Sequence, residues 1–442
     1  MTLLFSLAMF STLLQGEWLL FARAGWTFLV ILFVIDIRYS LYTIFFSAAF
    51  FHPSTFLPNH FFTLKHFHIA LALTLVVQIT KNQFWKNLVA GIKISRPLIY
   101  LILIISIGFI PFYRQSNPFS FYKVALNFLM VLSSFVYISG MIKKNEALLR
   151  HCLLLFTLGV TTHIIIAFLN FSTNSNFLGG LSIVHNNHLG VLSSFAVFHA
   201  IGYALSTSKI SFKIFGWLNV FLIFSALVLS CSRTSWFSFF ISYLIFINSF
   251  QSRIYSPPSW KKQKRLVIFG SIFIFLMIVF FLFKSNLTVS ERIGHLYQVA
   301  DFRYWKFTLN DYQNFGFLGA HRLRQINELW STLHTNPLLG RGFNNEVFGY
   351  HGFYYVVLGG SGLIGLALFF VFIRTLLVKL IRTLHNNSNS EKLLILKICI
   401  LCAMIDWLLC SVMETLFLQF SVWINIVACL IIIQPNKGKE TG

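Results

Sequence analysis

Charged residues are scarce in this chain, and acidic residues are the scarcest of them. Only 10% of the 442 residues are charged, and 12 Asp and Glu stand against 34 Lys and Arg, which gives a formal net charge of +22. Hydrophobic residues make up 57% of the chain, and the mean hydropathy is +0.75. That much apolar surface cannot be hidden in one water-soluble core. The composition therefore predicts a polytopic membrane protein.

Two signatures of other classes are also missing. The apolar and polar residues do not alternate as they do in a membrane barrel. Residues 1–16 have neither a basic leader nor a clear cleavage site, so we expect a first span there and not a signal peptide. Apolar runs of roughly 20 residues recur, and only helices satisfy their own backbone groups in a bilayer. We predict an all-α protein with about 12 to 14 transmembrane helices. Charges interrupt residues 1–50, which leaves one or three crossings open there.

The six cysteines do not indicate a metal or redox site. Cys399 and Cys402 form a C-x-x-C, but it lies inside an apolar run without a second ligand pair. His185 and His188 form an equally isolated pair and are expected at the membrane interface. We predict that the cysteines are small buried side chains, and they indicate no cofactor.

The positions of the cations argue against a nucleic-acid partner. They fall in alternate loops between the apolar runs, which is the pattern of cytoplasmic loops in membrane proteins. Topology and contact with anionic lipid headgroups account for most of the positive charge. The residues concerned are Lys81, Lys86, Lys93, Arg96, Lys143, Lys144, Arg150, Lys209, Lys213, Arg253, Lys261, Lys262, Lys264, Arg265, Arg374, Lys379, Arg382, Lys437 and Lys439.

Counting crossings from the basic segment 252–265 predicts the topology of the second half of the chain. If that segment is cytoplasmic, the apolar run 266–283 leaves the cytoplasm and a span beginning near Phe353 returns to it. The same parity places the short sequence CSRTSW, which contains Arg233, at the outer surface. We therefore expect Arg233 and the segment before Phe353 to lie on one face of the membrane.

This topology divides the chain into three parts. Residues 1–283 form an N-terminal transmembrane bundle, residues 284–350 form one large external loop, and residues 351–442 form C-terminal transmembrane helices and a cytoplasmic tail. A loop of that length is usually functional or disordered, and aromatic residues disfavour disorder. The aromatics in question are Phe302, Tyr304, Trp305, Phe307, Tyr312, Phe315 and Phe317. We expect the loop to be partly helical and to fold against the bilayer surface.

The sequence HRLRQINELWSTLHTNP near the end of this loop is typical of a helix that Asn336 and Pro337 terminate. Its predicted apolar stripe consists of Leu323, Ile326, Trp330 and Leu333. Arg324 precedes Glu328 by one helical turn, so an ion pair within the helix is sufficient to explain it. Arg322 has no carboxylate at those spacings. It is a candidate for a ligand's phosphate, although that feature alone favours a solvated or headgroup-facing arginine.

Four short motifs follow one another between residues 186 and 370. The first is N-H-L-G at residues 187–190, and the second is S-R-T at residues 232–234. An arginine, Arg322, then precedes N-P-L-L-G-R-G at residues 336–342. Last come His351 and, downstream of it, G-L-I-G-L at residues 362–366.

In this order and spacing the motifs resemble those of the O-antigen ligase and polymerase superfamily. The resemblance implies a GT-C-like helical enzyme of the bacterial inner membrane with a periplasmic active site. It also implies a metal-independent glycosyltransferase that uses an undecaprenyl pyrophosphate-linked glycan as donor. Two positions depart from the superfamily: Gly352 stands where members commonly have asparagine, and Gly360 where they commonly have glutamate.

The resemblance implies a role for each candidate residue. Arg233 and Arg322 would hold the pyrophosphate, with Arg341 and Arg324 as weaker helpers, because fixed cations stabilise the charge on a departing phosphate in place of a metal. His351 would be a general base or a hydrogen-bonding group that positions the acceptor. Without the motifs, His351 reads as an interfacial histidine that caps the helix beginning near Phe353. The glycines of residues 359–365 are expected to serve close packing and not to cradle a phosphate.

The resemblance leaves three functions open. A ligase would move the finished polysaccharide to lipid A-core, and a polymerase would move it to a growing glycan. Both use the same donor chemistry, and we place the ligase slightly ahead. A polysaccharide transporter or flippase is a distant alternative, because the chain shows no obvious inverted repeat and its candidate cations lie near one surface.

Glu414 is a possible supporting acid. It lies near the outer end of the span that contains Asp406, on a similar helical face. Both carboxyls either hydrogen-bond neighbouring helices, or Glu414 supplies the carboxylate that is missing beside His351. In the second case we expect Glu414→Gln to slow glycan transfer, because an amide does not stabilise a protonated imidazole. A wild-type rate in a transfer assay would remove Glu414 from the site.

Overall fold

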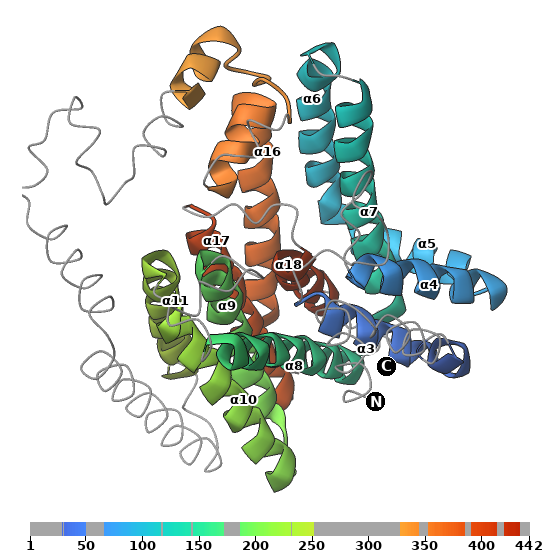
Figure 1. Ribbon diagram of the computed structural model, residues 1–442, viewed down its shortest axis with the longest axis vertical. Coiled ribbons are helices and arrows are strands. Elements are labelled where there is room, and N and C mark those ends of the chain that lie inside the picture. Colours follow the sequence, from blue (N-terminus) through green and yellow to red (C-terminus); the bar gives the residue numbers. More distant parts are fainter. Residues whose placement is uncertain are drawn as a thin grey trace, which may run out of the picture.

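The protein is helical throughout the part that its computed structural model describes (Figure 1). That part comprises residues 29, 31–49, 66–115, 118–142, 145–171, 186–230, 232–251, 328–343, 352–384, 390–412 and 420–433. The helices are α3 (Ile37–Ser47), α4 (His66–Thr80), α5 (Phe84–Ile94), the 3-10 turn η1 (Arg96–Leu98), α6 (Ile99–Gln115), α7 (Pro118–Ile142), α8 (Glu146–Phe171), α9 (Asn186–Ser206), α10 (Ile210–Leu229), α11 (Arg233–Gln251), α16 (Phe353–Leu384), α17 (Glu391–Cys410) and α18 (Phe420–Ile432).

Five of these helices are long and apolar enough to cross a bilayer: α8, α9, α10, α16 and α17. The bent pair formed by α5 and the segment Arg96–Pro111 would be a sixth crossing, with an angle of 71° between its halves. Shorter apolar helices lie in α4, α7 and α18. The described residues therefore form an all-α polytopic membrane protein. The total of about 12 to 14 spans stays a prediction, since residues 252–327 are outside the described part.

Helix α9 is the centre of one group of helices. It contacts α8, α10, α11 and α17, and the whole apolar window His188–Ser206 is buried. Small side chains allow these neighbours to approach, as expected for helices packed within a membrane. The exposed side chains of α10, in contrast, are large and apolar, such as Ile210, Phe212 and Leu218. Such a surface is suited to lipid contact, because exposing large apolar side chains to water is unfavourable.

The cysteines behave as the sequence predicts. Cys231 lies outside the described residues. The other five are free and buried: Cys152, Cys399, Cys402, Cys410 and Cys429. Cys399 and Cys402 pack within α17 against neighbouring helices, and Gly202 of α9 approaches Cys399 closely. Their role in the described part is packing.

Helix α16 is broken and folds back on itself at Gly362. This residue has φ 65° and ψ −163°, which lies outside the helical region. The ring centroids of Phe353 and Phe369 are only 4.8 Å apart, and those of Tyr354 and Phe370 are 5.9 Å apart. In a straight helix, Phe353 and Phe369 would be separated by about 24 Å along the axis. Residues 353–361 therefore form a short helix that lies antiparallel beside residues 363–384 (Figure 1).

The break corrects the span predicted to begin near Phe353. A helix does begin at Phe353, but the chain reverses before it crosses the molecule. The segment long enough to cross a bilayer is 363–384, which extends about 33 Å at the usual rise per residue. The sequence pattern missed the reversal because residues 353–384 are almost uniformly apolar on both sides of it.

The reversal frees backbone groups that a continuous helix would pair with one another. In an unbroken α16, the N–H groups of Leu363 and Ile364 would donate to the carbonyls of Gly359 and Gly360. A helix that ends inside a membrane protein must find other partners for these groups, because an unpaired N–H or C=O in lipid costs several kcal/mol.

Segment 337–342 provides partners for four of these groups. It contains most of the N-P-L-L-G-R-G motif and lies across the tip of the α16 hairpin. Four backbone hydrogen bonds join the two: Leu363 N–H to Pro337 O (2.9 Å), Ile364 N–H to Leu338 O (3.4 Å), Arg341 N–H to Gly359 O (2.8 Å) and Gly342 N–H to Gly360 O (3.1 Å). The loop thus replaces the bonds that the break removes.

Two glycines are required for this contact. Gly340 and Gly362 have φ values of 68° and 65°, which side chains on L residues disfavour. A Cβ on Gly340 would lie 2.5 Å from Gly359 O, and one on Gly362 would lie 2.3 Å from Leu338 O. The glycines were predicted to serve close helix packing, and close packing is present at Gly360 and Gly362, but the prediction is wrong about the partner, which is a loop and not another helix. The N–H groups of Arg341 and Gly342 are already used in the contact.

The helix predicted before this loop is present in its described half. Residues 328–335 are helical and Asn336 is not, so the predicted end is confirmed. The predicted apolar stripe is wrong at Trp330, which is 64% exposed, while Leu329 and Thr332 are buried. The buried face is therefore the one that carries Leu329 and Thr332, which packs against the protein. The large indole of Trp330 lies outside that face.

The reversal makes a prediction about stability. Gly362→Ala places a methyl group in a backbone region that is almost restricted to glycine, at a cost of about 1–3 kcal/mol, in addition to the clash with Leu338 O. We expect a clearly lower unfolding temperature for the detergent-solubilised variant. Leu363→Ala, at an exposed neighbouring side chain, is the control and should unfold close to wild type. Equal unfolding temperatures for Gly362→Ala and wild type would contradict the reversal.

Candidate functional site

Two of the sequence motifs meet where α9 and α11 begin. Gly190 of the N-H-L-G motif faces the start of α11 so closely that a Cβ would lie 2.6 Å from Ser232 Cβ and 2.9 Å from Ser235 Oγ. The hydroxyls of Ser232 and Ser235 are hydrogen-bonded at 2.8 Å. The N-terminal ends of α9 and α11 are therefore in direct contact, and the S-R-T motif lies at this contact.

Helix α17 ends at the same place. The Ser194 hydroxyl of α9 donates to Asp406 Oδ2 at 2.6 Å, and Ser238 Oγ of α11 lies 2.8 Å from Cys410 Sγ. Because Ser194 and Ser238 are near the beginnings of their helices and Cys410 is at the end of α17, α17 runs antiparallel to both. Asp406 is fully buried, and it bonds a neighbouring helix as one of the sequence interpretations expected.

The beginning of α16 is seated on the end of α17. The N–H of Phe353 donates to Ser411 O at 2.7 Å, and the Tyr354 hydroxyl donates to Leu408 O at 3.2 Å. Gly352 has φ 109°, and a Cβ there would lie 2.6 Å from Val412 O. This close backbone contact explains why glycine occupies position 352.

The predicted site residues divide into two groups. Arg322, Arg324, His351 and Glu414 lie outside the described residues. Arg233 is the first residue of α11, but the position of its side chain is not among those described. Arg341 is described in full: its N–H donates to Gly359 O at 2.8 Å and its Nη2 donates to Ser331 Oγ at 3.0 Å.

The described residues next to Arg233, His351 and Glu414 in the sequence lie at one end of the helices. Ser232 adjoins Arg233, Gly352 adjoins His351, and Val412 is two positions before Glu414. The contacts between α9, α11, α17 and α16 place Ser232, Gly352 and Val412 at the same end. This arrangement agrees with the parity that placed Arg233 and the segment before Phe353 on one face.

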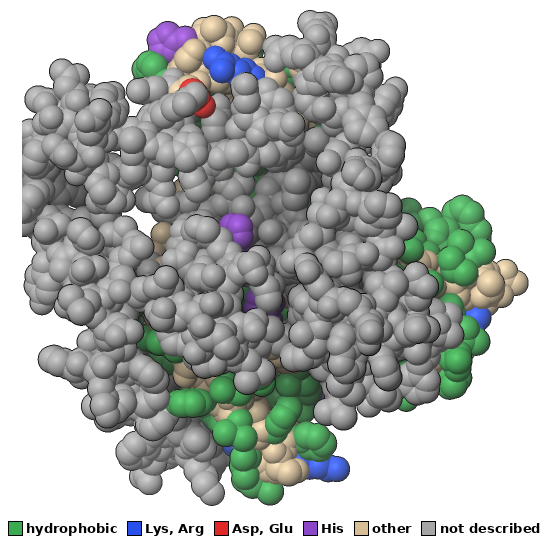
Figure 2. Space-filling model, viewed as in Figure 1, with side chains coloured by type: hydrophobic (Ala, Val, Ile, Leu, Met, Phe, Trp, Pro, Cys, Tyr) green, Lys and Arg blue, Asp and Glu red, His purple; other side chains and the backbone are tan. Residues whose placement is uncertain are grey.

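Segment 328–343 lies beyond this end, at the tip of the α16 hairpin. Figure 1 shows it above α16, and Figure 2 shows histidine, basic and acidic side chains gathered in the same region. The short helix 353–361 separates the tip from Gly352 by about 12 Å. The chain therefore carries polar groups both at the tip and at the seat of α16 on α17.

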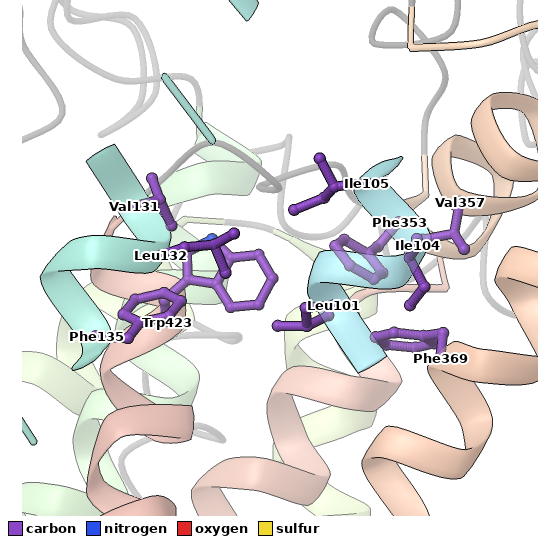
Figure 3. A pocket seen from close by; sticks show the side chains of 10 residues that line it. All are labelled: Leu101, Ile104, Ile105, Val131, Leu132, Phe135, Phe353, Val357, Phe369 and Trp423. Atoms are coloured by element: carbon purple, nitrogen blue, oxygen red, sulfur yellow. The ribbon is translucent and has the colours of Figure 1, made fainter. Parts of the chain in front are cut away.

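An apolar hollow lies beside the start of α16. It is small and lies between α6, α7, α16 and α18. Figure 3 shows α7 side chains on one side of it and α6 and α16 side chains on the other. The lining residues are Leu101, Ile104, Ile105, Val131, Leu132, Phe135, Phe353, Val357, Phe369 and Trp423. Apart from the indole N–H of Trp423 these side chains have no hydrogen-bonding group, so the hollow suits an apolar group.

A buried histidine–asparagine pair was not predicted from the sequence. His199 of α9 and Asn425 of α18 are 1% and 0% exposed, and His199 Nε2 lies 2.6 Å from Asn425 Oδ1. Asn425 Nδ2 donates to Ala403 O at 3.5 Å, so Oδ1 accepts from the Nε2–H tautomer of the histidine. Two polar residues inside apolar spans are a signal that could have identified this pair.

The described residues contain no group of three or more His, Cys, Asp or Glu side chains placed to hold a metal ion. Neither models of known protein families nor curated protein sequences match this chain.

The His199–Asn425 pair makes a second stability prediction. Asn425→Leu leaves the Nε2–H of His199 buried without a partner, which costs about 1–3 kcal/mol of unfolding free energy. In His199→Phe/Asn425→Leu both polar groups are removed together, so we expect this double variant to lose less than the sum of the two single losses. Thermal unfolding of the four proteins measures the coupling. Additive losses would show that the two side chains do not depend on each other.

Proposed function

We propose that this protein is a glycosyltransferase of the bacterial inner membrane that acts on its periplasmic side as an O-antigen ligase. Its donor would be a glycan linked to undecaprenyl pyrophosphate, and its acceptor would be lipid A-core. The alternative with the same donor chemistry is a polymerase that extends a growing glycan. In this proposal the fold is GT-C-like and residues 284–350 form the periplasmic loop.

One observation supports the proposal above the others. Motifs far apart in the sequence contact one another in pairs: N-H-L-G meets S-R-T, and N-P-L-L-G-R-G meets G-L-I-G-L. The residue after His351 contacts the end of α17, close in sequence to Glu414. A set of unrelated segments would have no reason to share these contacts, whereas an active site built from them would.

The proposed chemistry assigns a task to each residue. An acceptor hydroxyl attacks the anomeric carbon, the bond from that carbon to the pyrophosphate oxygen breaks, and undecaprenyl pyrophosphate leaves with the electron pair. Arg233 and Arg322 hold the diphosphate and stabilise the charge that builds on it. His351 receives the hydroxyl proton or positions the hydroxyl, and the proton then passes to solvent. The reaction needs no metal because the guanidinium groups supply the positive charge.

The apolar hollow is consistent with a lipid-linked substrate. It lies beside Phe353, two positions after His351, and its lining is almost entirely apolar, although it is too small to take the whole carrier. A polyprenyl carrier needs apolar surroundings close to the point where its pyrophosphate reacts. A soluble sugar nucleotide has no lipid chain and would not need apolar surroundings.

A reconstituted assay tests the proposed function. The purified protein is supplied with a lipid-pyrophosphate glycan, with EDTA present, and with either core lipid or a second repeat unit. We expect glycan on core lipid. A lengthened donor would identify a polymerase, and donor moved across liposomes without either product would identify a transporter.

In the same assay, Arg322→Ala should lower the transfer rate by an amount equivalent to about 2–4 kcal/mol of transition-state stabilisation. His351→Ala should also lower it strongly. Arg324→Ala is the matched control and should have a smaller effect, because an ion pair with Glu328 is sufficient to explain Arg324. Full activity of Arg322→Ala or His351→Ala would remove that residue from the site.

A further inference from the structure

The position of Arg341 leads to a role different from the pyrophosphate binding expected from the sequence. We propose that Arg341 is a positioning residue that fixes the angle between helix 328–335 and the tip of the α16 hairpin. It would thereby set the distance between the chain segments that lead to Arg322 and to His351. The proposal rests on the proposed function for its effect on catalysis, but the brace itself can be tested without activity.

One side of this arrangement is anchored firmly. Phe343 is completely buried, and its N–H donates to Gly108 O of α6 at 3.3 Å. Its ring is so close to α6 and α16 that a Cβ on Gly108 or on Gly360 would lie 2.3 Å from it. Together with the four backbone bonds to the hairpin tip, this contact makes segment 337–343 a fixed support.

Helix 328–335 joins that support through a tight turn. The N–H of Asn336 donates to Thr332 O at 2.8 Å, and the N–H of Gly340 donates to Asn336 O at 3.0 Å. The buried side chains Leu329 and Thr332 hold one face of this helix against the protein. A second contact, at an exposed residue away from the turn, further limits rotation of the helix about the turn.

Arg341 supplies the second contact. Its N–H belongs to the support, since it donates to Gly359 O at 2.8 Å. Its guanidinium Nη2 reaches across the turn and donates to Ser331 Oγ at 3.0 Å. The side chain therefore braces the helix against the hairpin tip.

The length of the helix makes the angle important. If the helix extends back to Arg322, as the sequence predicts, Arg322 would be about 21 Å from the turn at Asn336 along the axis. A swing of about 10° about the turn would then move Arg322 by about 4 Å. A misplacement of about 1 Å in a catalytic site lowers the rate by up to about a hundredfold. The hydrogen bond needs both side chains, so Ser331 is as important to the brace as Arg341, although it carries no charge.

A double-mutant cycle separates positioning from direct binding. With Ser331→Ala, Arg341→Ala and both together, we expect each single variant to lower kcat about tenfold or more with little change in the KM for the lipid-linked donor. The double variant should be no slower than the slower single variant. Thr335→Ala is the matched control, because it removes an exposed hydroxyl of the same helix that bonds within that helix. A raised donor KM for Arg341→Ala, with Ser331→Ala at wild-type activity, would overturn the proposal in favour of pyrophosphate binding.

A distance measurement tests the brace independently of the reaction. Spin labels are attached to Trp330→Cys and Leu363→Cys, at two exposed positions, in a variant whose native cysteines are replaced. We expect one narrow distance distribution, which Ser331→Ala and Arg341→Ala each broaden and Thr335→Ala leaves narrow. Unchanged distributions would overturn the brace even if the transferase activity is confirmed. Broadened distributions in a protein without transferase activity would retain the brace and reject the proposed function.

Discussion

The structure depends on the exchange of backbone hydrogen bonds at the tip of α16. A helix that reverses leaves N–H and C=O groups without their intrahelical partners, and such groups are costly when they are buried unpaired. Segment 337–342 satisfies these groups at Gly359, Gly360, Leu363 and Ile364. Without this segment the four groups would lose these partners. The loop and the hairpin are therefore one structural unit, although the sequence between them includes residues 344–351.

The same reversal sets the beginning of α16 below the hairpin tip. Helix 353–361 carries the chain from the seat on α17 to the hairpin tip, a rise of about 12 Å. The beginning of α16 is consequently set among buried aromatic rings such as those of Phe369, Trp407 and Trp423. Electrostatic interactions are stronger where water is excluded, and under the proposed function this would strengthen the hold of fixed cations on a departing diphosphate.

The sequence was sufficient for the class of fold and for much of its organisation. The apolar runs predicted helices, the end of helix 328–335 at Asn336 is confirmed, and the parity of the basic loops agrees with the shared end of α9, α11 and α17. The reversal at Gly362 could not be predicted, because periodicity does not distinguish one long apolar helix from two that fold back on each other. His199 and Asn425 were missed because each is isolated in the sequence, and only the fold makes them a pair. The roles of Arg322, Arg324, His351 and Glu414 stay predictions, and Arg341 shows how a cation selected by motif is used in a contact that no motif contains.

The pairing of the hairpin tip with residues 337–342 also has a consequence for biosynthesis. Chains are made from the N-terminus, so the capping segment has already been synthesised when residues 353–384 leave the ribosome. The tip can then be capped as soon as residues 353–364 have been made, and its backbone groups do not stay unpaired while the remainder of the chain is made. A hairpin capped by a later segment would have to wait in an unsatisfied state. The order of the two motifs along the chain therefore favours correct insertion as well as the final fold.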